Sequence, residues 1–170
     1  MKNPQAGEYL TDLLYTAIQN GYYEYPEMKD ILRHAIRRIS DGLRYWHAMN
    51  EYRTKKVKQQ VANKSLNTPP AYQNFCNKNF RHEHIVPAGV IFEYLINRNY
   101  TDKKQIYEVL DKFCITATIT KEEDKLLDSN GYKLKMPDEF YDPSSNLCDD
   151  PFARYRAVGL DRELVKGFQN

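Results

Sequence analysis

The stretch Arg81-His82-Glu83-His84-Ile85-Val86-Pro87 decides how the rest of this chain is interpreted. It places a carboxylate directly before a histidine and ends at a proline, which favours an extended backbone at the residue before it. A histidine can take a proton from water, and a carboxylate can hold a divalent metal. The stretch therefore predicts a metal site that activates water. Because neighbouring strand residues point to opposite faces, Glu83 or His84 should sit at a strand end or in a turn.

Apolar periodicity predicts regular elements on both sides of this stretch. A helix is expected from Glu8 to Gln19, and a second one opens at Pro26 and continues to about Ala62, with Trp46 in the core. Residues 66–71 contain two prolines and are expected to form a linker. Beyond the heptapeptide we expect a helix at 102–113 with an Asp102/Gln105 capping box, a strand at 114–120, and helices at 121–127 and around 161–168.

The 170 residues suffice for one domain, or for a helical module joined to a small catalytic one. No apolar run approaches the roughly 20 residues that cross a bilayer, and the N-terminus lacks the apolar core of a signal peptide. We therefore expect a cytoplasmic protein with no membrane partner. Three widely spaced cysteines indicate neither a disulfide framework nor a zinc knuckle, and buried thiols are expected.

Charge is distributed unevenly along the chain. Residues 1–81 hold 13 Lys or Arg and 7 Asp or Glu, a net charge of +6, whereas residues 82–170 hold 12 and 16, a net charge of −4. Residues 50–81 alone contain seven basic residues and one acid, with Tyr52, Tyr72, Phe75 and Phe80 among them. Such a segment can contact phosphates and stack on bases, although a solvated helical surface has the same composition.

Two segments resemble a known nuclease family. Residues 83–87 are similar to the D-H-I-V-P signature that opens the ββα-metal, or HNH, motif, and residues 119–125 are similar to the segment that ends its second strand and starts its helix. The resemblance covers residues 80–128. It implies an α+β fold in which a basic helical module, residues 1–68, precedes an HNH-like ββα module, residues 69–170. That second module would carry a helical insertion and a C-terminal extension.

The resemblance also implies roles for individual residues. His84 becomes the general base, Glu83 a metal ligand and Asp124 the remaining ligand, with Glu123 behind it. His82 shares a face with His84 in a regular strand and is a further candidate ligand. Phosphate charge would be offset by Arg81, Lys121 and Lys125. Oxygen ligands favour Mg²⁺ or Mn²⁺, whereas a contribution from His82 would favour zinc or nickel. The expected substrate is DNA in preference to RNA.

Other interpretations fit the same residues. The chain has no histidine after His84, and an acid or Lys125 stands near the place of the family's helix asparagine. Residues 122–124 can form a solvated first helical turn, and Arg154-Tyr155-Arg156 can make a surface ion pair and a core-edge tyrosine instead of a phosphate contact. The chief alternative is a non-enzymatic binding or inhibitor protein of a phage-defence or toxin system with a decayed motif. A helical RNA-binding module without metal is a third.

Overall fold

The computed structural model describes residues 5–40, 52–62 and 78–166. The protein combines helices with a four-stranded mixed sheet, which confirms the predicted α+β class. The chain divides into two compact units, and each is built from two separate segments. We call residues 1–48 with 84–115 the helical unit, and residues 49–83 with 116–170 the sheet unit. The predicted boundary between residues 68 and 69 lies outside the described residues.

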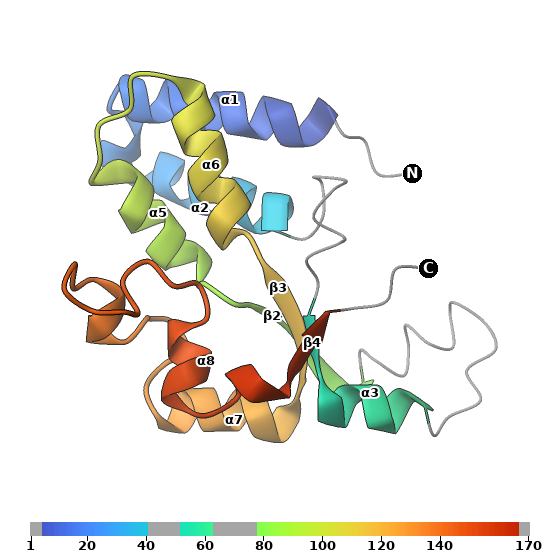
Figure 1. Ribbon diagram of the computed structural model, residues 1–170. Coiled ribbons are helices and arrows are strands. Elements are labelled where there is room, and N and C mark those ends of the chain that lie inside the picture. Colours follow the sequence, from blue (N-terminus) through green and yellow to red (C-terminus); the bar gives the residue numbers. More distant parts are fainter. Residues whose placement is uncertain (1–4, 41–51, 63–77, 167–170) are drawn as a thin grey trace. The chain divides into compact units, whose positions relative to one another are not determined.

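The helical unit packs two pairs of helices around an apolar core (Figure 1). Helix α2 contacts α5, and α1 contacts α6. Apolar side chains at helical spacing, such as Leu14, Leu32 and Ile36, are almost fully buried. The bounds are α1 Gln5–Gln19, η1 Tyr22–Glu24, α2 Pro26–Arg38, α5 Ala88–Ile96 and α6 Lys103–Phe113. The predicted first helix, the start of the second at Pro26 and the capping box of α6 are confirmed.

The sheet unit is built on four short strands in the order β2-β3-β1-β4. Strand β1 runs parallel to β3 and antiparallel to β4. Helices α3 and α7 begin at the residues that follow β1 and β3, so the parallel pairing places both helix starts at one edge of the sheet (Figure 1). The bounds are β1 Tyr52–Thr54, α3 Lys55–Ala62, β2 Phe80–His84, β3 Thr116–Thr120, α7 Lys121–Ser129, η4 Asp138–Phe140, α8 Ala153–Ala157, η5 Asp161–Glu163 and β4 Leu164–Lys166.

The structure corrects two predicted helices. The second helix was expected to continue to about Ala62, but β1 interrupts it because residues 52–54 pair with β3 on one side and β4 on the other. The helix expected at 161–168 is a single 3-10 turn followed by β4, whose Val165 lies opposite Arg53. Both corrections depend on strand partners that are distant in the sequence. Helix α8 falls within a region where no helix was expected.

Several sequence predictions concern particular residues or absences. Cys114 is buried, as expected, and neither it nor the partly exposed Cys148 forms a disulfide with another described residue. Trp46, the linker at 66–71, Tyr72 and Phe75 lie outside the described residues. Within the described ranges, none of the helices is both long enough and apolar enough to span a membrane.

Candidate functional site

Strand β2 carries the residues that the sequence singled out. Arg81 and Glu83 lie on the same face of the strand because side chains alternate. His84 is the last residue of β2, and the chain bends at the two residues that follow it. This is the strand-end position that was expected for one member of the Glu83-His84 pair. His82 is exposed, and His84 is partly buried.

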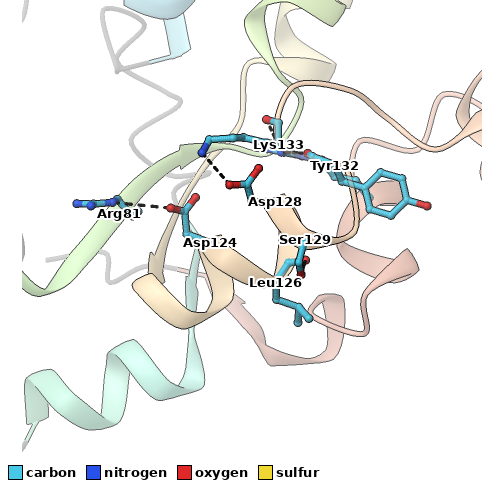
Figure 2. A network of polar contacts seen from close by, with 8 residues as sticks. Arg81, Asp124, Leu126, Asp128, Ser129, Tyr132 and Lys133 are labelled. Atoms are coloured by element: carbon cyan, nitrogen blue, oxygen red, sulfur yellow. Dashed lines mark hydrogen bonds and ion pairs between the residues drawn. The ribbon is translucent and has the colours of Figure 1, made fainter.

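Helix α7 brings acidic side chains to the Arg81–Glu83 face of β2. The Arg81 Nε lies 3.8 Å from the Asp124 Oδ2, so this ion pair joins β2 to α7 (Figure 2). Asp128 follows Asp124 by four residues, and side chains at that spacing share one face of a helix. Figure 2 shows the Asp124 and Asp128 carboxylates beside each other, flanked by the cations of Arg81 and Lys133.

The ammonium of Lys133 is paired with the Asp128 carboxylate. Its Nζ lies 3.1 Å from the Asp128 Oδ2. This hydrogen bond and the charge of Asp128 raise the pKa of Lys133, and the charges of Asp124 and Glu83 add to the effect. Lys133 therefore contacts one of three carboxylates on this side of the sheet unit. We call Glu83, Asp124 and Asp128 the acidic cluster.

Glu83 is also bound by a fully buried arginine. The Arg154 Nη2 donates to the Glu83 Oε1 at 2.6 Å. The side chain of Arg154 has no exposed surface, whereas that of Glu83 is 20% exposed. The sequence left open a phosphate contact or a surface ion pair for Arg154, and the structure shows a buried ion pair instead.

Tyr155, next to Arg154, is fully buried rather than at the edge of the core. Burial raises the pKa of its phenol far above the usual range. The positive charge of Arg154 opposes that rise, and the negative charges of Glu83, Glu123 and Asp124 add to it. The phenol therefore stays neutral beside this group of charges.

Glu123 has a structural role that accounts for its burial. It is only 2% exposed, and its Oε2 accepts hydrogen bonds from the Thr120 N–H and the Thr54 hydroxyl, both at 2.8 Å. The Thr120 hydroxyl in turn accepts from the Glu123 N–H at 3.2 Å, completing a capping box. The carboxylate therefore joins the starts of α3 and α7, where both helix dipoles stabilise negative charge. Of residues 122–124, only Glu122 is fully exposed to solvent. It alone fits the solvated first helical turn that was considered for this triplet.

The structure brings together only part of the predicted site. Asp124 pairs with Arg81, which lies on the Glu83 face of β2, and Lys121 and Lys125 are exposed on α7. Among the described residues, no three His, Cys, Asp or Glu side chains are grouped closely enough to hold a metal ion. Asp128, Lys133 and Arg154 were not predicted as site residues. The four-residue spacing from Asp124 was a signal for Asp128, whereas Arg154 was considered only for a phosphate contact or a surface ion pair, and nothing local pointed to Lys133.

Comparison with protein-family models, with curated proteins and with solved structures finds no match. The residues of β2 and α7, with their contacts and charges, are therefore the basis for the function proposed for this protein.

Proposed function

We propose that this protein is a metal-dependent nuclease in which β2, β3 and α7 form a ββα-metal module. One observation carries the proposal: the Arg81–Asp124 ion pair puts an acid of α7 beside the strand that bears Glu83 and His84. Strands β2 and β3 are neighbours in the sheet, and α7 begins at the residue after β3. The order strand, strand, helix is the one that the resemblance to HNH nucleases implies.

The acidic cluster has the chemistry that a hard divalent cation needs. The two residues proposed as ligands, Glu83 and Asp124, would offer carboxylate oxygens, which suit Mg²⁺ and Mn²⁺ and leave the other positions to water and substrate phosphate. One member of the cluster, Asp128, already pairs with a cation, the ammonium of Lys133. In this proposal Glu83 and Asp124 hold the metal, and Lys133, whose side chain is 56% exposed, turns away toward solvent.

The proposed reaction is hydrolysis of a phosphodiester. His84 takes a proton from water, the water oxygen bonds to phosphorus, the bond from phosphorus to the ester oxygen breaks, and the leaving oxygen takes a proton from solvent. A bound divalent metal supplies charge stabilisation for the phosphate oxygens. Arg81 contributes a further positive charge, and its side chain is half exposed.

Exposed lysines supply a surface for the phosphates of the substrate. Lys121 and Lys125 lie on α7, as predicted, and the structure adds Lys55 and Lys56 in the first turn of α3. The parallel pairing of β1 with β3 places these helix starts at one edge of the sheet, and the Thr54–Glu123 hydrogen bond joins them. Lysines that contact phosphates give affinity without sequence preference. DNA is the proposed substrate, and RNA is tested beside it.

The experiment is a cleavage assay on plasmid DNA and on total RNA with Mg²⁺ or Mn²⁺, with and without EDTA. We expect metal-dependent cleavage that falls by about 10²–10⁴-fold in His84→Ala, the usual contribution of a general base. His34→Ala is the matched control, since His34 is a histidine of α2 outside the proposed site. Absence of cleavage with either metal, or full activity of His84→Ala, would refute the nuclease.

A second candidate is a non-enzymatic binding or inhibitor protein. It is favoured by the contacts that occupy two of the predicted ligands, since Glu83 pairs with Arg154 and Glu123 caps α7. Such a protein would bind nucleic acid or a protein partner without cutting nucleic acid, and chelator would not change its affinity. The same cleavage assay, run beside a binding assay with and without EDTA, separates the two candidates.

A further inference from the structure

Arg154 joins three separate segments of the sheet unit. Besides Glu83 of β2, its guanidinium contacts the carbonyl oxygens of Tyr132 and Lys133, with Nη1 distances of 2.6 and 3.3 Å. These two residues follow the turn that ends α7, and Arg154 itself belongs to α8. A single buried side chain therefore holds β2 and the segment after α7 in fixed relation.

These contacts restrict the position of the Glu83 carboxylate. A guanidinium is planar and presents its donors in a rigid fork, so each acceptor is held at a defined place. A buried arginine needs such partners because an unpaired charge in the interior is strongly unfavourable. The contact to Glu83 is short and charge-assisted, and it uses one carboxylate oxygen, Oε1. Glu83 is thus held from its buried side while part of its side chain remains exposed.

Arg154 also positions Lys133, the cation that pairs with Asp128. By binding the Lys133 carbonyl it fixes the backbone from which the Lys133 side chain reaches Asp128. Figure 2 shows Lys133 extending from this segment toward the Asp128 carboxylate. The buried guanidinium of Arg154 therefore holds both Glu83 and the backbone of Lys133 in place.

We infer that Arg154 is a positioning residue, which orients Glu83 for binding a divalent metal ion. This inference rests on the proposed nuclease function. Groups that hold a metal ligand in place from behind commonly change metal affinity by about 10–100-fold when they are replaced. Arg154, with no exposed surface, acts through Glu83 and does not touch the substrate.

The test measures Mn²⁺ binding to the full chain, by the electron paramagnetic resonance signal of unbound Mn²⁺. We expect Arg154→Lys, which keeps the charge and removes the fork, to raise the dissociation constant for Mn²⁺ by about 10–100-fold. Arg156→Lys is the matched control. Arg156 lies on the same helix and pairs with Asp150 and Asp161 instead of Glu83. Its replacement should leave the dissociation constant unchanged.

A second comparison separates positioning from a general effect on the fold. Arg154→Lys is combined with Glu83→Gln, and each single variant is measured as well. A residue that acts through Glu83 has no further effect on Mn²⁺ affinity once Glu83 is replaced. An equal decrease in both backgrounds, or wild-type affinity in Arg154→Lys, overturns the inference. Should Arg154→Lys fail to fold, Arg154→Gln, which keeps an amide donor for the carbonyls, is judged by the same criteria.

The two proposals fail in different ways. A wild-type protein that binds Mn²⁺ and cleaves nucleic acid, while Arg154→Lys behaves identically, refutes only the role of Arg154. A wild-type protein that neither binds Mn²⁺ nor cleaves refutes the nuclease and this inference together. A decrease in Mn²⁺ affinity that requires the native Glu83 supports both.

Discussion

Replacing Glu123 tests whether this buried carboxylate holds the sheet unit together or serves as a metal ligand. Its Oε2 accepts two hydrogen bonds, from the Thr54 hydroxyl and the Thr120 N–H. A hydrogen bond to a charged group contributes about 1.5–3 kcal/mol to stability. Glu123→Ala removes both and leaves two buried donors without this acceptor, while relief from burying a charge offsets part of the effect. We expect the free energy of unfolding to fall by about 3 kcal/mol.

The assay is thermal unfolding followed by circular dichroism, in EDTA and in Mg²⁺. For a chain of this length about 1 kcal/mol shifts the melting temperature by roughly 2–4 °C, so Glu123→Ala should melt about 6–12 °C lower. The control is Glu122→Ala, because Glu122 is the exposed neighbour in the same helical turn and its replacement should change the melting temperature little.

Two results would refute this reasoning about Glu123. One is a melting temperature of Glu123→Ala equal to that of Glu122→Ala, which would mean that the two hydrogen bonds contribute nothing net. The other is a destabilisation that is seen in Mg²⁺ and is absent in EDTA. That result would assign the carboxylate to metal binding instead of to joining α3 and α7.

Three further predictions concern other parts of the molecule. Gly131 has a φ of +78°, so Gly131→Ala should cost about 1–2 kcal/mol in chemical denaturation, whereas Gly89→Ala, in a helix with space for the methyl group, should be neutral or stabilising. Burial raises the pKa of Tyr155 above its unfolded value near 10. The contribution of the neutral phenol to stability is therefore complete below about pH 10 and decreases as the pH rises above it. Tyr155→Phe should flatten the fall in melting temperature between about pH 9 and 11. Replacing both Lys55 and Lys56 with glutamine should reduce the slope of the logarithm of DNA affinity against the logarithm of salt concentration, by about 0.9 for each phosphate that these lysines neutralise. Replacing the two lysines that open α6 with glutamine is the control and should leave this slope unchanged.

Elements with local signals were predicted correctly. The capping box of α6 needs only Asp102 and Gln105, three residues apart, and both of its reciprocal bonds form. Pro26 opens α2 because proline suits a first helical turn. The β-branched run before Lys121 forms β3, and α7 begins directly after it. In each case, the residues that decide the structure lie within a few positions of one another.

The shortest strands depended on the tertiary structure. Strands β1 and β4 have three residues each, too few to show a periodicity, and they are strands because β1 pairs with β3 and β4 pairs with β1. The surrounding sequence has helical character, and the ladder of backbone hydrogen bonds overrode it. Local propensity is weak compared with the pairing that a neighbouring strand provides.

The residues proposed to carry the chemistry are visible in the sequence: the Glu83-His84 pair, the acids that open α7 and the lysines beside them. What those acids contact depends on how the chain folds. Arg154 lies 71 positions from Glu83, and Thr54 lies 69 positions from Glu123, so no local pattern relates them. The physical reason is that a buried charge must find its partners wherever the packed chain brings them. Two carboxylates that look alike in the sequence therefore have different roles, one in a buried ion pair and one as a helix cap.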